Sequence, residues 1–326
     1  MKAILFDGPG GPEVLYAGDF PDPIQKGNEL LVRVRASALN RADLLQRRGH
    51  YPPPPCESPV LGLEIAGEVL EAGPEARPWK QGDRVCGLVG GGGYAELAVL
   101  PAAMAMPVPQ GWSWEMAASV PEAFMTAWQS LRWLGRLAAG EKVLIHAGAS
   151  GVGTAAIQLA REIGASDIFV TASARKHALC AQLGASLSVD YHSEDFREVL
   201  GEICPEGIDV IVDCIGGPYF QKNLQVLRLD GRLIMLAMMG GATVENTDLM
   251  PFLRKRLQVM GSTLRNRSLE YKSRLTKDLF DFAWPLFENG RLKPIVDKVF
   301  PVEDVVAAHH YMENNQNQGK IILSAF

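Results

Sequence analysis

The chain has 326 residues, enough for two domains, and apolar residues make up 47% of it. Its 32 Lys and Arg against 37 Asp and Glu give a net charge of −5, and no basic cluster appears, which argues against a nucleic-acid scaffold. The five cysteines are widely spaced without a C-x-x-C pair and the N-terminal apolar run stops at Asp7, so we expect reduced thiols, no secretory leader and a cytoplasmic protein.

Residues 1–117 carry the pattern of a β-rich domain. The segment Leu30 to Ala38 alternates apolar and polar residues, as a half-buried strand does, and Gly- and Pro-rich turns separate the segments that follow. We expect a barrel-like unit with one short helix near 41–48. The further strands are predicted at 62–72, 83–89 and 94–100.

From about Trp114 onward, longer helical segments alternate with short apolar strands. This alternation indicates βαβ units, and therefore a doubly wound parallel sheet over 118–261. Residues 262–326 are expected to return and complete the first domain. Helices are predicted at 116–134, 151–163, 176–183, 219–227, 271–288 and 302–314, and strands at 142–147, 167–172, 208–214, 232–237 and 320–324.

The most specific local motif runs from His146 to Gly153, H-A-G-A-S-G-V-G. It follows an apolar strand and opens a helix, which is the context of a dinucleotide-binding turn. Gly148, Gly151 and Gly153 permit close approach of the backbone to a pyrophosphate, and the N-terminus of the helix favours its charge. Ser150 stands where the second glycine of G-x-G-x-x-G belongs, so cofactor binding here depends on the βαβ context as well as on the motif.

The stretch 171–176, T-A-S-A-R-K, follows the second strand of this domain. NAD enzymes usually place an acid there to bind the ribose 2′-hydroxyl, whereas this stretch has hydroxyls and two cations. The alternative is that Arg175 and Lys176 only begin a solvated helix, although cations are unfavourable at a helix N-terminus. We therefore predict NADPH rather than NADH as cofactor.

The sequence as a whole resembles the medium-chain dehydrogenase/reductase superfamily. Within it, the chain is similar to the zinc-free, zeta-crystallin-like quinone oxidoreductases, and among these to the branch containing the tumour-suppressor-inducible quinone oxidoreductase. The matching motifs span the chain in the family's order. They are S-A-L-N-R-A-D at 37–43, G-L-E-I-A-G at 62–67, G-D-R-V at 82–85, G-G-G-G-Y-A at 90–95, the turn at 146–153, L-G-A at 183–185, D-C-I-G-G at 213–217 and G-K-I-I-L at 319–323.

The resemblance implies a GroES-like β-barrel catalytic domain (1–117 with 262–326), a Rossmann domain (118–261), an active site between them and a homodimer. It implies that Ser173, Lys176 and Tyr191 surround the 2′-phosphate of NADPH, and that Asn40, Tyr51 and Ser150 lie near nicotinamide and substrate. The remaining cofactor contacts it implies are Gly148, Gly151, Val152, Gly153, Cys214, Ile215 and Gly216.

The resemblance also bears on zinc. Zinc alcohol dehydrogenases of the superfamily use Cys, His and Cys as catalytic ligands, and the corresponding positions here hold Asn40, Leu63 and Glu122. Leucine cannot ligate a metal and an amide is a poor zinc ligand. We therefore expect no metal site.

A site without a metal suits an electrophilic acceptor. Hydride transfer to a quinone yields a phenolate-like anion, comparable to Tyr with a pKa of ~10, whereas an alkoxide has a conjugate acid about as weak as water and needs a Lewis acid. The sequence therefore predicts an NADPH:quinone reductase. An enal or enone reductase is the alternative within enzymes, and a crystallin-like NADPH-binding structural or RNA-binding protein is the alternative outside them.

Two side chains are candidates for contact with the substrate. Tyr51 lies in H-Y-P-P-P-P and can donate to a substrate oxygen, or it can merely pack against the prolines. Ser150 can bond the nicotinamide or the substrate, or it can be an ordinary turn serine. Neither has an evident activating base, so we expect both to act by hydrogen bonding.

Overall fold

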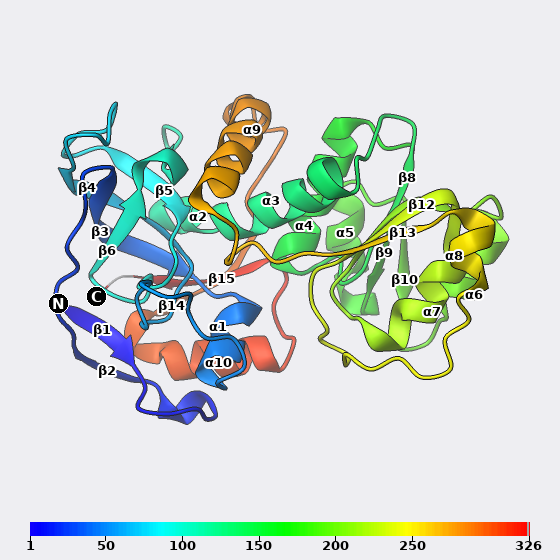
Figure 1. Cartoon of the computed structure of the whole chain (residues 1–326), viewed down its shortest axis with the longest axis horizontal. Helices are drawn as coiled ribbons and strands as arrows, with labels where there is room; N and C mark the ends of the chain where they lie inside the picture. The colour runs from blue at the N-terminus through cyan, green and yellow to red at the C-terminus, as the bar shows by residue number, and fades with distance from the viewer. Residues whose placement is uncertain (325) are drawn as a thin grey trace. The chain divides into compact units, whose positions relative to one another are not determined.

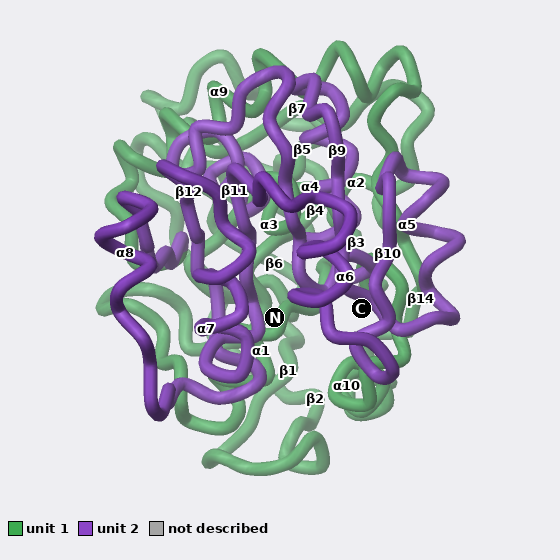
Figure 2. Tube along the Cα trace, turned by 90° about the vertical axis from the view of Figure 1, so that its right-hand side faces the viewer, with its two compact units in different colours: residues 1–125, 265–326 green, residues 126–264 purple. Residues whose placement is uncertain are grey.

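The computed structural model describes residues 1–324 and 326. The chain divides into two compact units, coloured green and purple in Figure 2. Unit 1 is Met1–Met125 with Arg265–Phe326, and unit 2 is Thr126–Leu264. The boundaries between the units therefore follow Met125, which lies inside helix α3 (Pro121–Trp128), and Leu264. The sequence pattern placed these boundaries after residues 117 and 261.

Unit 1 is built on a seven-stranded, mainly antiparallel sheet, whose strands carry the blue, cyan and red colours of Figure 1. Its central strand β3 (Glu29–Ala38) buries Leu30, Val32 and Val34 on alternate positions, as its pattern predicts. The strand order is β14 (Val296–Pro301), β15 (Lys320–Ser324), β3, β4 (Glu64–Ala72), β5 (Arg84–Leu88) and β7 (Met106–Pro107), with β6 (Leu97–Pro101) also paired to β3.

The C-terminal segment completes this sheet. Strand β15 pairs antiparallel with β3, with Leu323 opposite Ser37, and residues 265–326 belong to unit 1. Helices α1 (Arg41–Arg47) and α10 (Val305–Glu313) pack beside the hairpin β1 (Lys2–Leu5) and β2 (Tyr16–Asp19) around one apolar core. The remaining helices of unit 1 are α2 (Trp114–Ala118), α9 (Leu269–Glu288) and the 3-10 turns η1 (Pro12–Val14), η2 (Ala102–Met104) and η5 (Val302–Asp304).

The single helix predicted at 116–134 is wrong. The structure has α2, then α3 beginning at Pro121, then the π-helical segment η3 (Gln129–Leu134). Proline lacks the N–H that a continuing helix needs and restricts the residue before it, so α2 ends and a new helix starts with the proline in its first turn. The apolar periodicity runs through both helices and conceals this break.

Unit 2 is a six-stranded parallel sheet with helices on both faces, which confirms the predicted α/β class and the Rossmann-like fold. Its strand order is β10 (Leu187–Asp190), β9 (Asp167–Ala172), β8 (Lys142–Ile145), β11 (Ile208–Asp213), β12 (Leu227–Met235) and β13 (Gln258–Gly261). The helices are α4 (Gly151–Ile163), α5 (His177–Leu183), α6 (Phe196–Ile203), α7 (Gly217–Val226) and α8 (Met250–Lys255), with the 3-10 turn η4 (Ala174–Lys176) before α5.

Alternate residues of the central strands point to opposite faces of this sheet. Leu144 of β8 and Ile211 of β11 pack with Phe196 and Leu224 from α6 and α7. Their neighbours Val143, Ile145, Val210 and Val212, which face the other side, are equally buried. Burial on both faces explains why these strands are continuous apolar runs in the sequence. No helix in the described part of the chain is long and apolar enough to cross a membrane.

Candidate active site

The turn from β8 into α4 is the predicted dinucleotide motif, and its geometry requires its glycines. A Cβ on Gly153 would lie 2.4 Å from the carbonyl oxygen of Ala147, and one on Gly148 would lie 2.7 Å from the Cβ of Val170. Ala147 itself adopts a left-handed φ of 54°. The backbone is therefore packed too closely for side chains at these two positions, as a dinucleotide-binding turn at the start of a helix requires.

Ser150 is the N-cap of α4. Its Oγ accepts a hydrogen bond from the backbone N–H of Gly153 at 3.0 Å, as a capping serine does. Ser150 therefore caps the helix, as an ordinary turn serine does. The hydroxyl proton remains available to donate to a bound molecule, since capping uses only the oxygen as acceptor.

Ser173, Lys176 and Tyr191 are brought to one edge of the sheet. Strands β9 and β10 run parallel and end at Ala172 and Asp190, which are register partners, and Ser173 and Tyr191 follow them directly. The backbone N–H of Lys176 donates to the carbonyl oxygen of Ser173 at 2.8 Å. A hydroxyl, a phenol and an ammonium thus follow the carboxyl ends of neighbouring strands, where open α/β sheets bind their ligands.

Cys214, Ile215 and Gly216 form the turn after β11. The buried carboxylate of Asp213 holds this turn: its Oδ1 accepts from the N–H of Ile215 at 2.6 Å and from that of Gly216 at 3.3 Å. Gly216 has a φ of 87°. Because β8 and β11 are adjacent and parallel, this turn and the 147–150 turn lie at the same edge of the sheet.

In unit 1, Asn40 belongs to a buried network of three polar side chains. The Nζ of Lys320 donates to Glu64 Oε1 at 2.6 Å, to Asn40 Oδ1 at 2.7 Å and to the carbonyl oxygen of Leu39 at 2.9 Å. The Nδ2 of Asn40 donates to Glu64 Oε1 at 2.8 Å and to the carbonyl oxygen of Ala38 at 3.3 Å. Both N–H bonds of Asn40 are therefore used inside unit 1, and its oxygen, which can only accept, already accepts from Lys320.

Asp43 fixes the backbone at Asn40. Its carboxylate accepts from the N–H of Asn40 at 2.7 Å, from the N–H of Gly62 at 3.2 Å and from the hydroxyl of Tyr94 at 3.1 Å. Complete burial nevertheless raises the pKa of Asp43 to about 6, because desolvation of the charge outweighs these bonds.

Tyr51 contacts a charged residue that the sequence analysis did not single out. The guanidinium of Arg265 lies 5.4 Å from the centre of the Tyr51 ring, and its Nη1 donates to the carbonyl oxygen of Tyr51 at 3.4 Å. Arg265 is anchored by two bonds to the carbonyl oxygen of Gly90, at 2.7 and 3.1 Å. Burial raises the pKa of the Tyr51 hydroxyl, with Glu122 adding to the shift, so the phenol keeps its proton near neutral pH.

The residues at the expected zinc-ligand positions do not form a donor set for a metal. Leu63 is a buried hydrocarbon side chain, and Asn40 is bonded to Lys320 and Glu64. Among the residues that the structure describes, no cluster of three or more His, Cys, Asp or Glu is placed to hold an ion. All five cysteines lie among the described residues, and none of them forms a disulfide.

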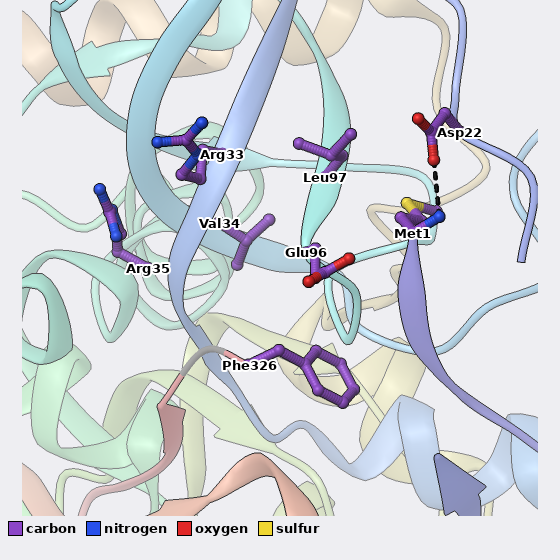
Figure 3. A pocket seen from close by; sticks show the side chains of 8 residues that line it. All are labelled: Met1, Asp22, Arg33, Val34, Arg35, Glu96, Leu97 and Phe326. Atoms are coloured by element: carbon purple, nitrogen blue, oxygen red, sulfur yellow. Dashed lines mark hydrogen bonds and ion pairs between the residues drawn. The ribbon is translucent and has the colours of Figure 1, made fainter. Parts of the chain in front are cut away.

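A surface pocket of about 530 Å³ lies in unit 1, and none of the candidate site residues described above lines it (Figure 3). The backbone amine of Met1 forms an ion pair with Asp22 at its rim, at 2.6 Å. The pocket is lined by Met1, Asp22, Arg33, Val34, Arg35, Glu96, Leu97 and Phe326, none of which was predicted as a site residue.

Comparisons with known proteins support the same reading of the fold. Residues 26–110 match the family model described as an alcohol dehydrogenase GroES-like domain, and residues 183–323 match one described as a zinc-binding dehydrogenase. The synaptic vesicle membrane protein VAT-1 homolog of Rattus norvegicus is 31% identical over 99% of this chain and 84% of its own length. The human homolog is 30% identical, over 99% and 86% respectively.

Two solved structures are similar over almost the whole chain. The Escherichia coli quinone oxidoreductase complexed with NADPH superposes with a TM-score of 0.89 at 30% identity, covering 99% of this chain and 100% of that one. The CurK enoyl reductase gives 0.88 at 27% identity, covering 100% and 99%. The chain belongs to the medium-chain dehydrogenase/reductase superfamily, a superfamily of oxidoreductases.

Proposed function

We propose that this protein binds NADPH through unit 2 and uses it to reduce a quinone without zinc. The cofactor part of the proposal is supported by the glycine turn, in which a side chain at Gly148 or Gly153 would collide with neighbouring atoms, and by Ser173, Lys176 and Tyr191 at the adjacent strand ends. The similarity to a quinone oxidoreductase that was solved with NADPH supports it independently.

We expect NADPH to bind at least tenfold more tightly than NADH. Lys176→Ala should remove most of that preference, because a charge-assisted phosphate contact is worth roughly 1.5–3 kcal/mol. Fluorescence titration of both cofactors against the wild type and the variant measures this. Lys277→Ala, on the exposed surface of α9, is the control and should leave both affinities unchanged. Equal affinities of the wild type for the two cofactors would contradict the assignment.

One observation supports a quinone as the acceptor: the hydrogen-bonded network of Asn40, Glu64 and Lys320 offers no free donor atoms for a metal ion. A metal ion would need donor atoms where Leu63 stands, and the carboxylate of Glu64 already accepts from Lys320, Asn40 and the backbone N–H of Glu122. Without a Lewis acid, hydride transfer favours an acceptor whose product anion is stabilised by resonance. Bound NADPH would supply the hydride.

The chain's own residues then have limited tasks. The Tyr51 hydroxyl, kept protonated by burial, can donate a hydrogen bond to a substrate oxygen, and Arg265 restrains the loop that carries it. Asn40 can only accept, because both of its N–H bonds are used. These residues orient the acceptor and exclude water, and solvent can protonate the phenolate-like product.

A panel of acceptors tests the reaction. We expect NADPH oxidation with ortho- or para-quinones, little or no oxidation of simple alcohols with NADP⁺, and no loss of activity after prolonged dialysis against a chelator. A simple alcohol turning over faster than every quinone tried, or activity that disappears with the chelator and returns with zinc, would refute the proposal.

Adding α,β-unsaturated ketones to the same panel of acceptors tests the second candidate function, that of an enone reductase. The similarity to the CurK enoyl reductase favours this candidate. A hydride adduct of an α,β-unsaturated ketone is an enolate, which is also resonance-stabilised and needs no metal. Faster turnover of enones than of quinones would assign this activity instead.

A further inference from the structure

A chain of buried hydrogen bonds links the 147–150 turn and the 214–216 turn of unit 2. Both turns belong to the proposed NADPH site, and we call them the cofactor turns. His146 follows β8 and is 2% exposed. Its Nδ1 lies 3.1 Å from the Oγ1 of Thr171, at the end of β9, and its Nε2 lies 2.8 Å from the Oδ1 of Asn223, in α7. The rings of Phe196 and Tyr219 pack edge-on against the imidazole at 4.8 and 4.7 Å.

The direction of each bond follows from Asp213. A carboxylate only accepts, so the side-chain atom of Asn223 that meets Asp213 Oδ2 at 3.0 Å is its NH₂. The amide oxygen of Asn223 therefore faces His146, and Nε2 must donate to it. Nδ1 is then the acceptor and receives the hydroxyl proton of Thr171, whose Oγ1 accepts in turn from the N–H of Ala147 at 3.3 Å.

The surroundings of His146 favour the uncharged ring. Burial lowers its pKa, which the charge of Asp213 and the bond to Asn223 only partly offset. Tyr219, whose ring packs against the imidazole, is uncharged at pH 7 because burial raises its pKa to about 12. The Cys214 thiol lies 3.9 Å from the carbonyl oxygen of His146.

The two ends of this chain are the two turns. At one end, Thr171 holds the N–H of Ala147, the residue with left-handed backbone that opens the 147–150 turn. At the other end, Asp213 holds the N–H groups of Ile215 and Gly216. A displacement of either turn therefore breaks a hydrogen bond to a buried side chain, and a buried polar group is costly to leave unpaired.

We propose that Thr171, His146, Asn223 and Asp213 form a positioning relay that couples the two cofactor turns, with His146 acting as the neutral tautomer protonated on Nε2. This inference rests on the proposed function, in that the turns it positions are taken to bind NADPH. None of the four side chains needs to touch the cofactor. They are positioning residues, and they set cofactor affinity by fixing the backbone N–H groups on which it depends.

Two measurements on the full-length protein test the relay. Nitrogen-15 NMR of the histidines without cofactor should show His146 protonated on Nε2 and bare on Nδ1 at pH 7. Thr171→Val keeps the shape of the side chain but removes its hydroxyl, and should weaken NADPH binding about tenfold in a protein that is still folded at 25 °C, the equivalent of one buried hydrogen bond. Thr171→Ser should restore the affinity to within about threefold of the wild type.

Thr276→Val is the matched control. Thr276 is also buried, but its hydroxyl donates to the carbonyl oxygen of Lys272 within α9, so the same substitution there should leave NADPH affinity unchanged. A proton on Nδ1, an imidazolium at pH 7, or an unchanged affinity in folded Thr171→Val would overturn the relay while the proposed function stood. A wild-type protein that did not bind NADPH would overturn the proposed function, and with it the purpose assigned to the relay.

Discussion

Replacing Lys320 with methionine is expected to destabilise unit 1 by about 3–5 kcal/mol, the range found when one partner of a buried ion pair is removed. The side chains of Lys320 and Glu64 are 6% and 0% exposed, and the substitution leaves the Glu64 carboxylate buried without a cation. At roughly 2–4 °C per kcal/mol for a domain of this size, the thermal midpoint of unit 1 should fall by roughly 6–20 °C.

Differential scanning calorimetry measures this loss, and two controls separate the buried charge from other effects of the substitution. Lys277→Met breaks an exposed pair with Asp281 and should cost no more than about 0.5 kcal/mol. The double variant Glu64→Gln with Lys320→Met removes both charges and should recover a large part of the loss. The interpretation fails if Lys320→Met costs as little as Lys277→Met.

Gly153→Ala is expected to weaken NADPH binding by more than about a hundredfold, the equivalent of losing at least two charge-assisted hydrogen bonds to phosphate. The new Cβ would lie 2.4 Å from the carbonyl oxygen of Ala147 and 2.5 Å from that of Gly148, and both are backbone atoms of the 147–150 turn. The turn must therefore move, and its N–H groups move with it.

Gly201→Ala is the control for this substitution. Gly201 lies in α6, and a Cβ there would meet nothing within 4 Å. That variant should bind NADPH as the wild type does and be slightly more stable, by about 0.5–1 kcal/mol, because alanine favours the helix. Fluorescence titration of both variants decides the matter, and wild-type affinity in Gly153→Ala would show that the cofactor does not use this turn.

The features that the sequence predicted well are those set by local chemistry. The helix predicted at 151–163 and the strands predicted at 167–172 and 320–324 have those bounds in the structure, because apolar runs, glycine turns and capping residues act over a few residues. The edge strand β13 and the helix α8 were missed, since each has only a few residues and so short a segment shows no periodicity that distinguishes helix from strand.

The partners of the individual site residues could not be predicted from local sequence patterns. Asn40 was chosen from its motif, but its bonds to Glu64 and Lys320 join residues 24 and 280 positions apart. Arg265 has no signal of its own in the sequence, because its partners, the carbonyl oxygens of Gly90 and Tyr51, are backbone atoms that any residue possesses. The role of such a cation is defined only by what folding places around it.

By itself, the amino-acid sequence determined that this protein has a parallel α/β unit with a glycine turn after its first strand, because hydrophobic period and turn chemistry are local properties. Only the tertiary structure determines the hydrogen-bonded chain through His146 and the ion pair between Lys320 and Glu64, which also bonds to Asn40. Thr171, Asp213 and Asn223 are ordinary polar residues in the sequence, and become one hydrogen-bonded chain only because parallel strands end at the same edge of a sheet. Burial then removes water as an alternative partner, so each of these groups must bond to the others.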